Sequence, residues 1–445
     1  MKLRRISLSL VAILWFLCPL WAQNESAKPG PVTVIKFGTL IPEDGSGRVL
    51  NHALVTVSGD RIRSVSTGTA QIPAGATVID LSNYTGIPGL IDAHTHMTYY
   101  WSGKPGTTPF TESRARLPQE TVFYAQANAR QCLEIGVTTV RDLAAQNYSD
   151  LALRNLINAG AIEGPRMFVA GPGLHAGGAV PTLGFVFPGI ERPLGQANGV
   201  PEVMQTVREE IAAGIDVVKM FASTGSFQDV TEHETFTYDE IQAAVQVAHQ
   251  MGKRIAVHTY GPDGARDAAR AGADTIEHPV DMDDATLREI AAKHIIYTPT
   301  VYHNVWYAEN AKEFGWNDKQ VADLDDFVRR NEETVRRALQ AGVRIDMGSD
   351  AVYNSFGKNT HELEYLVKSG MTPAQALEAA TANGAAALGM DKSLGAVAPG
   401  YFADIVAVEG NPLADVNAVI DGVRWVMKGG KVVVDHTRAE PGAGN

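Results

Sequence analysis

The chain contains very little cysteine: only Cys18 and Cys132 occur among its 445 residues. Cys18 lies in an N-terminal segment that is expected to be removed, so Cys132 would remain alone. A lone cysteine excludes an internal disulfide in the mature chain. Cys132 falls in a helical stretch at 123–135, and we expect it to be a buried structural thiol.

Long hydrophobic runs are also lacking, apart from one at the N-terminus. Lys2, Arg4 and Arg5 precede an apolar run at 6–20, and the small residue Ala22 follows it. This pattern is typical of a signal peptide, here residues 1–22. The run is short for a membrane span and a polar segment follows it. We therefore expect export to the periplasm or the extracellular medium, with no stable membrane anchor.

Positive charge is in deficit, because 38 Lys and Arg stand against 50 Asp and Glu, for a net charge of -12. Nucleic acids and anionic membrane surfaces repel an acidic protein, so neither is expected as a partner. The charge does not constrain a small substrate, because a cleft can carry a local field of either sign. A hydrophobic content of 45% is enough for a large core.

The sequence has no short-period repeat and no low-complexity tract, and its segments differ in the secondary structure that they predict. Residues 23–85 and 393–445 carry short β-rich segments separated by turns, such as Gly429-Gly430. Because these two ends flank a different middle, we expect them to meet in one small β-sandwich domain.

Residues 86–392 alternate apolar β-like runs with helical segments. Strict β/α alternation implies a parallel sheet, and eight units imply a closed (β/α)8 TIM-like barrel, so the fold class is α/β. The clearest amphipathic stretches lie at 202–213, 238–251 and 319–341. The eight strand candidates are 86–93, 137–142, 166–170, 217–221, 254–257, 275–277, 295–298 and 344–347.

The strongest chemical signal is His94-Thr95-His96 at the end of the first candidate strand. Residues i and i+2 of a strand face the same side, so both imidazoles can enter the mouth of the barrel. Active sites of this fold lie at the C-terminal ends of the strands. One His-x-His is weak evidence by itself, because two histidines can simply face solvent.

Other strand ends strengthen the case for a metal site. His258 ends the fifth candidate strand, His278 follows the sixth and Asp350 follows the eighth. Taken singly, a loop histidine or a helix N-cap aspartate needs no function. Lys219, within the fourth strand, does need an explanation, since a buried lysine is rarely unpaired. Such residues gathered at the strand ends of one barrel favour metal binding.

Two phrases are highly specific: Pro-Gly-Leu-Ile-Asp-Ala-His-Thr-His at 88–96 and Leu-Gly-Ala-Val-Ala-Pro-Gly-Tyr-Phe-Ala-Asp at 394–404. With them the chain resembles the amidohydrolase superfamily, in its binuclear metal-dependent branch, over almost all of the mature sequence. The resemblance implies two divalent ions and a lysine carboxylated by CO2, and zinc is the expected metal because imidazole and carboxylate suit it. The implied ligands are His94, His96 and Asp350 for the first ion, His258 and His278 for the second, and Lys219 for the bridge.

The same resemblance implies amide hydrolysis by a metal-bridging hydroxide. Two ions about 3.5–4 Å apart lower the pKa of a shared water toward about 7, and one of them polarises the substrate carbonyl. Asp350 would be the catalytic proton shuttle, because it faces this water and can pass the proton to the leaving amine.

The subgroup is indicated by Ile-Ala-Val-His-Thr-Tyr-Gly at 255–261 and Ala-Gly-Ala-Asp-Thr-Ile-Glu-His at 271–278. These phrases are similar to the branch of Xaa-Pro dipeptidases, Xaa-Arg carboxypeptidases and imidazolonepropionases, whose relatives also cleave N-acyl amino acids such as ochratoxin. In the peptidases a tyrosine matching Tyr260 contacts the substrate α-carboxylate, and a histidine near the position of His175 touches the substrate. Here His175 precedes Gly177-Gly178, whereas the family histidine follows paired glycines.

The sequence also offers further candidates for the lining of the pocket. Tyr302 and His303 follow the seventh strand and are candidates for substrate binding. Aromatic residues on the loops at 98–118 and 181–199 suit either a lid over an apolar substrate side chain or ordinary loop packing.

The expected function is therefore a dipeptidase, carboxypeptidase or N-acyl amino acid amidohydrolase acting on a small amide or short peptide. One alternative is a cyclic-amide hydrolase of the imidazolonepropionase type, and another is a non-catalytic barrel that only binds. A one-metal deaminase is disfavoured, because such enzymes typically lack the bridging lysine and carry a glutamate where Gly261 stands. Family members are often oligomeric, so both a monomer and a homo-oligomer are compatible with the sequence.

Overall fold

The computed structural model describes residues 32–68, 70–104, 107–109, 111–112, 116–177, 193–223 and 233–438. The predicted signal peptide at 1–22 lies outside the described residues. Of the loop predicted at 181–199, only 193–199 is described. Within these ranges, no helix is both long enough and apolar enough to cross a membrane.

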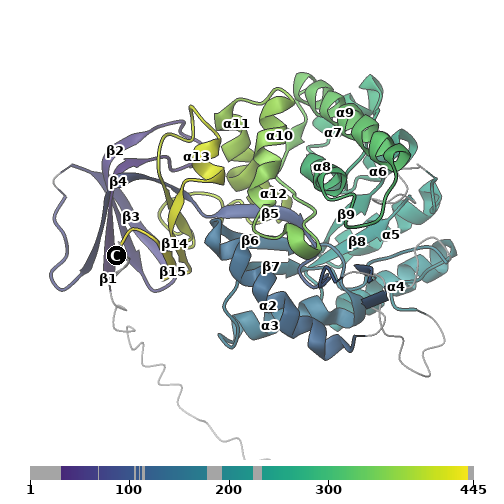
Figure 1. The fold of residues 1–445 in the computed structure, drawn as a ribbon, viewed down its shortest axis with the longest axis horizontal. Helices are drawn as coiled ribbons and strands as arrows, with labels where there is room; N and C mark the ends of the chain where they lie inside the picture. The colour runs from purple at the N-terminus through teal and green to yellow at the C-terminus, as the bar shows by residue number, and fades with distance from the viewer. Residues whose placement is uncertain are drawn as a thin grey trace, which may run out of the picture. The chain divides into compact units, whose positions relative to one another are not determined.

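Eight parallel strands form the predicted (β/α)8 barrel (Figure 1). Hydrogen bonding groups them in the orders β5-β6-β7 and β12-β11-β10-β9-β8. The strands are β5 (Leu90–Thr95), β6 (Val137–Asp142), β7 (Arg166–Val169), β8 (Val217–Phe221), β9 (Arg254–His258), β10 (Thr275–Glu277), β11 (Ile296–Thr298) and β12 (Arg344–Ile345).

Two seams close the barrel between these groups. At the first seam the backbone N–H of Ala93 donates to the carbonyl of Met347 at 2.8 Å. At the second, the N–H of Asp216 donates to the carbonyl of Val169 at 2.8 Å. Neighbouring strands are thus tied together all the way round, and their C-terminal ends meet at one mouth.

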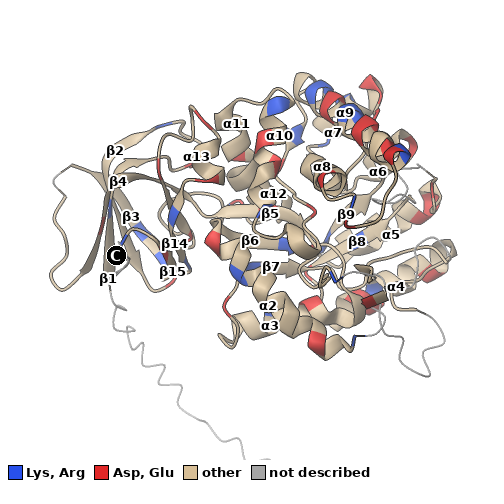
Figure 2. Cartoon of the chain, viewed as in Figure 1, with Lys and Arg blue, Asp and Glu red and all other residues tan. Residues whose placement is uncertain are grey.

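Amphipathic helices surround the strands, and α9 carries charges of both signs (Figure 2). The stretches predicted at 202–213, 238–251 and 319–341 fall on α4, α5 and α9, and Gly342 follows α9 with a φ of 76°, which suits a glycine after a helix end. The helices are α2 (Pro118–Glu134), α3 (Ser149–Asn158), α4 (Gly199–Ala213), α5 (Tyr238–Gln250), α6 (Pro262–Ala271), α7 (Asp284–Ala292), α8 (Val301–Glu309), α9 (Asp318–Gln340), α10 (Glu362–Lys368), α11 (Pro373–Glu378), α12 (Gly384–Ala387) and α13 (Asn417–Ile420).

Both ends of the chain build a seven-stranded sheet in the order β15-β14-β13-β4-β1-β2-β3. The predicted hairpin turn at Gly429-Gly430 joins β14 to β15, with φ of 54° and 75°. The strands are β1 (Val32–Leu40), β2 (Leu50–Ser58), β3 (Arg61–Thr67), β4 (Thr77–Pro88), β13 (Ile405–Val408), β14 (Val423–Lys428) and β15 (Lys431–Asp435).

Several strand boundaries differ from the sequence prediction by one or two residues, and the largest difference lies at the start of the first barrel strand. Residues 86–88, assigned above to the first barrel strand, instead end β4 of the seven-stranded sheet and pair antiparallel with β13. The barrel strand β5 begins at Leu90. The apolar run continues across the junction, so hydrophobicity alone did not reveal where one sheet gives way to the other.

The two faces of this sheet belong to different cores, because alternate residues of a strand point to opposite sides. On β13, Ile405 and Ala407 pack into a cluster with Trp425 of β14, which joins strands from both chain ends. Val406 and Val408 pack into the large core that contains the barrel and its helices. Cys132 on α2 is buried in this large core, as predicted, with a free thiol.

Candidate active site

The six predicted metal ligands are all buried at the C-terminal ends of the barrel strands. Five of them lie at or just beyond the C-terminal end of a short buried strand, and Lys219 lies in the middle of β8. The ligands and their positions are His94 in β5, His96 just after β5, Lys219 in β8, His258 at the end of β9, His278 after β10 and Asp350 after β12.

His94, His96 and Asp350 form one tight group, whose possible ligand atoms all lie within 4.8 Å of one another. The Nε2 atoms of His96 and His94 lie 3.1 Å and 3.6 Å from Oδ1 of Asp350. A backbone hydrogen bond of 2.7 Å from the N–H of Asp350 to the carbonyl of His94 joins the two segments. Two imidazoles and a carboxylate in this arrangement are a suitable donor set for a divalent transition metal.

A second group adjoins the first. The ring centroids of His258 and His278 lie 4.7 Å apart, and those of His94 and His278 also lie 4.7 Å apart. The side chain of Lys219 is fully buried, and its Nζ lies 5.0 Å from the ring centroid of Phe221. Five of the six predicted ligands thus lie in two adjoining groups, and the charge of Lys219 contributes to the lowered pKa values of His94 and His258.

Three polar atoms in these groups are buried without a hydrogen-bond partner among the described residues. They are Nε2 of His94, Nζ of Lys219 and Oδ1 of Asp350. Buried polar atoms in native proteins are nearly always paired, so unpaired ones require an explanation such as an ion. The donor set and these three atoms together fit a metal site.

Burial sets the protonation states at the site. It lowers the pKa of Lys219 to about 8, although the carboxylates of Glu277 and Asp350 act in the opposite direction. Burial, followed by the charge of Lys219, lowers the pKa of His258 to about 3 and that of His94 well below its ordinary value. Neutral imidazole is the form that binds a metal, and a lysine with a lowered pKa offers a reactive neutral amine.

Each of three histidines has a second partner on its Nδ1 atom. His94 Nδ1 lies 2.8 Å from Oε2 of Glu277, and His278 Nδ1 lies 2.7 Å from Oγ1 of Thr300. His96 Nδ1 lies 3.1 Å from the carbonyl oxygen of Ala144, which can only accept. With the proton on Nδ1, Nε2 keeps the lone pair that a metal ligand needs.

The backbone is strained at two of the ligands. His278 and Asp350 have φ of 76° and 49°, values that side chains other than glycine rarely adopt. Such conformations persist where the surroundings impose them, and they gather at functional sites. Here the strained turns aim both side chains back into the mouth of the barrel.

His303 and Tyr302 lie at the start of α8 and face different surroundings. His303 Nδ1 donates to the carbonyl oxygen of Asp350 at 2.8 Å, and its Nε2 lies 3.4 Å from Oδ2 of the same residue. Tyr302 stacks on His361 at 5.1 Å within an aromatic cluster. His303 is thus a neighbour of the metal group, whereas Tyr302 packs beside it.

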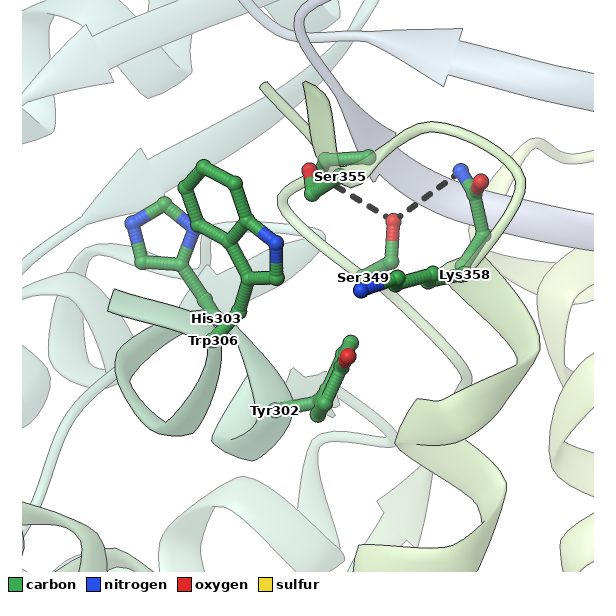
Figure 3. Close-up of a pocket in the computed structure, with 8 residues that line it drawn as sticks. Tyr302, His303, Trp306, Ser349, Ser355 and Lys358 are labelled. Atoms are coloured by element: carbon green, nitrogen blue, oxygen red, sulfur yellow. Dashed lines mark hydrogen bonds between the residues drawn. The ribbon is translucent and has the colours of Figure 1, made fainter. Parts of the chain in front are cut away.

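A small pocket lies next to this group (Figure 3). Tyr302, His303 and Trp306 of α8 line one side, and Ser349 and Lys358 lie among the residues opposite. Ser349 and Ala351, the two residues that flank Asp350 in the sequence, are among the lining residues of the pocket.

The two remaining predicted substrate residues occupy different positions. The ring of Tyr260 lies 5.1 Å from His258 and 5.4 Å from His278, so it borders the second group directly. His175 is half-buried, and its Nδ1 lies 3.3 Å from the carbonyl oxygen of Gly173 in its own loop. That loop contacts the site, because the N–H of Leu174 donates to the carbonyl of Lys219 at 2.8 Å.

Sequence reasoning missed several residues around the site. Glu277 and Thr300 contact ligand histidines, and Arg141 binds Glu277. Tyr99 stacks on His96 with ring centroids 4.6 Å apart. A charged residue inside an apolar strand was the signal that singled out Lys219, and the same signal would have found Arg141 and Glu277.

A closed barrel with a buried histidine–carboxylate group at its mouth defines a metal-binding barrel enzyme. Comparison with known proteins gives the family. The sequence model of the amidohydrolase family matches residues 85–433. The chain therefore belongs to the amidohydrolase family, and it is a hydrolytic enzyme.

Individual relatives cover almost the whole chain. Ochratoxinase from Aspergillus niger is 30% identical over 441 residues, which span 92% of this chain and 88% of that protein. The crystal structure of a Xaa-Pro dipeptidase with bound methionine in its active site has a TM-score of 0.81 and 30% identity, over 91% of this chain and 100% of the other. The crystal structure of A. niger ochratoxinase has a TM-score of 0.77 and 28% identity, over 91% and 96%.

Proposed function

We propose that this chain is a binuclear metal-dependent hydrolase of C–N amide bonds, acting on dipeptides or N-acyl amino acids. The observation that carries the proposal is the convergence of four histidines, one aspartate and one lysine at the barrel mouth, with three of their polar atoms buried and unpaired. A solvated surface cluster would leave no such atoms without partners.

The proposed ligands divide into two sets. His94, His96 and Asp350 hold the first ion, and His258 and His278 hold the second. Two histidines alone are too few for a stable site, which is why the buried Lys219, whose charge acts on His94 and His258, matters. Divalent ions held by these residues would activate a water near neutral pH and would polarise the amide carbonyl.

Lys219 is proposed to bridge the sets as a carbamate. Its neutral Nζ amine adds to CO2, forming the N–C bond and releasing one proton. This reaction converts a cation, which would repel two dications, into an anion with an oxygen for each. Burial supports it, because burial lowers the pKa of Lys219 to about 8 and so raises the fraction of neutral amine near neutral pH.

Asp350 is proposed to move the proton. Its carboxylate accepts a proton from the attacking water and donates it to the leaving nitrogen, which departs as a neutral amine. The hydrogen bond that the carbonyl oxygen of Asp350 accepts from His303 Nδ1 holds this segment in place. Removing the carboxylate therefore removes both a ligand and the proton carrier.

The substrate class rests on the relatives and on Tyr260. One similar structure is that of a Xaa-Pro dipeptidase, and another is an ochratoxinase, so release of an amino acid from an amide is the shared expectation. Tyr260 borders the second histidine pair, where its hydroxyl can donate to the α-carboxylate of such a substrate. We also propose export, on the pattern at residues 1–22.

The test uses purified protein from residue 23 onward, supplied with zinc and bicarbonate. Xaa-Pro, Xaa-Arg and Xaa-Phe dipeptides, N-acyl amino acids and one cyclic amide are compared for product release. Chelator-sensitive release of a C-terminal amino acid is the expected result. Hydrolysis of the cyclic amide alone would contradict the proposed substrate class, and absence of bound metal would contradict the site itself.

A matched pair of variants tests the proton carrier. Asp350→Asn is expected to lower kcat by several orders of magnitude while the fold is retained. Asp346→Asn makes the same chemical change in a buried aspartate four residues earlier and is expected to keep kcat. Near-normal turnover in Asp350→Asn would refute the assigned role.

A further inference from the structure

We propose that Glu277 is a positioning residue that fixes which nitrogen of His94 carries the proton, and that Arg141 holds Glu277 in this role. The inference rests on the proposed function, in which His94 binds a metal through Nε2. It extends that proposal to residues inside the barrel, below the ligands.

The hydrogen bonds around Glu277 define its role. Oε2 lies 2.8 Å from His94 Nδ1, and both side chains are fully buried. Oε1 accepts from Arg141 Nη2 at 3.0 Å. A carboxylate paired with an arginine can only accept, so His94 must donate through Nδ1–H. Nε2 of His94 is then unprotonated and faces Oδ1 of Asp350 at 3.6 Å.

Strand alternation places these side chains inside the barrel. Thr275 and Glu277 are two residues apart on β10, so they share the inner face, and Thr275 Oγ1 donates to Oε1 of Glu277. Arg141 comes from β6, four strands away around the barrel, and its side chain is 1% exposed. The guanidinium therefore crosses the interior to reach Glu277.

Arg141 also forms a hydrogen bond with the backbone of β5, the strand that carries His94. Its Nε donates to the carbonyl oxygen of Ala93 at 2.5 Å, and its Nη1 donates to Thr275 Oγ1 at 2.9 Å. Ala93 immediately precedes His94. One buried cation thus fixes both the backbone beneath His94 and the carboxylate that orients its ring.

A carboxylate is required at this position because it lies between two donors. In Glu277→Gln one end of the side chain becomes an NH2 group. If that group faces Arg141, a donor meets a cation. If it faces His94, the imidazole must accept at Nδ1, and its proton moves to Nε2, where it blocks metal binding. The first orientation loses the ion pair with Arg141 that holds the side chain in place, and the second puts the proton on the nitrogen that would bind the metal, so each is expected to weaken the first metal set.

Asp346 provides a matched control within the same barrel interior. Its side chain is fully buried, and neither carboxylate oxygen has a hydrogen-bond partner among the described residues. Asp346→Asn is therefore the same acid-to-amide change near Arg141, without a contact to a ligand histidine. It makes the same acid-to-amide change in a buried carboxyl group and leaves the Glu277–His94 hydrogen bond intact.

The first measurement is zinc affinity, by competition with a chromophoric chelator as a function of pH. Glu277→Gln is expected to weaken one of the two sites by about 10–100-fold, while Asp346→Asn matches wild type. Equal affinity in wild type and Glu277→Gln would overturn the positioning role. If wild-type protein binds no zinc, the proposed function fails instead, so the two failures are distinguishable.

A second measurement does not depend on whether Glu277→Gln folds. In metal-free wild-type protein, the nitrogen chemical shifts of His94 report its tautomer, with assignment by comparison with His94→Gln. We expect the proton on Nδ1. A proton on Nε2 would overturn the proposal regardless of how the variants behave.

Discussion

Thr300 allows a direct test of the second metal set, because its hydroxyl is the hydrogen-bond partner of one proposed ligand, His278. Its Oγ1 lies 2.7 Å from Nδ1 of His278, and both residues are buried. Thr300→Val removes this oxygen and keeps the shape of the side chain. When a metal occupies Nε2, the proton must stay on Nδ1, where it would face a methyl group.

The expected loss of zinc affinity in Thr300→Val follows from the Nδ1–H group of His278, which has lost its acceptor. A buried N–H without a partner costs about 1–3 kcal/mol. In the metal-free protein His278 can shift its proton to Nε2, so most of this cost falls on the metal-bound form. Because a tenfold change in affinity corresponds to about 1.4 kcal/mol, the second site is expected to weaken about 10–100-fold.

The assay is chelator competition on wild type, Thr300→Val and Thr300→Ser. Serine keeps the hydroxyl, so Thr300→Ser is expected to bind zinc nearly as wild type does. Denaturant unfolding in the presence of excess chelator checks that each metal-free variant is folded. The reasoning is refuted if Thr300→Val binds both zinc ions within about twofold of the wild-type affinity, which is well below the expected change.

Three other predictions concern the same barrel. Lys219→Ala should lose bound metal and activity together, and a short carboxylic acid should partly restore both; activity without added acid would argue against the bridge. Burial raises the pKa of Asp346 from 3.8 to about 7, so the folded chain holds this proton more tightly than the unfolded chain does. As pH rises from 4 to 7, the unfolding free energy of wild type should therefore fall relative to that of Asp346→Asn, by at most about 4 kcal/mol. Denaturant titrations at several pH values measure this difference, and a difference that stays constant with pH would contradict the prediction. Gly348→Ala should destabilise the protein by about 1–3 kcal/mol and weaken zinc binding, because the added Cβ would meet Thr298 Cγ2 at 2.3 Å and His94 Cβ at 2.8 Å. An unchanged free energy of unfolding in this variant would show that the neighbouring atoms move aside without cost.

Much of the fold could be predicted because its signals are local. The β/α alternation and the amphipathic periods of α4, α5 and α9 arise from residue spacings of two and about 3.6. The glycines at 429–430 marked a hairpin turn in the same way. The start of β5 was wrong by four residues, since residues 86–88 are as apolar as those that follow, and only pairing with β13 assigns them to the other sheet.

The ligand set illustrates the same division. His-x-His spacing and the other strand ends pointed to the six residues, because in a parallel barrel every strand end arrives at one mouth. The roles of Tyr302 and His303 looked alike from sequence, as adjacent residues after one strand. The helix that begins there turns His303 toward Asp350 and Tyr302 toward His361, a difference that neighbouring positions on a helix impose.

The sequence by itself determined the eightfold alternation, the strand ends and the residue types placed on them, because each depends on spacing along the chain. Only the tertiary structure decided which strand lies across the barrel from which. Glu277 reaches His94 across 183 residues of sequence, and Arg141 reaches Glu277 across 136. The alternation of residues along a strand predicts that a side chain points into the barrel, but the closure of the barrel determines which side chain it meets there. For His94 that partner is Glu277, which determines the nitrogen that is free to bind a metal.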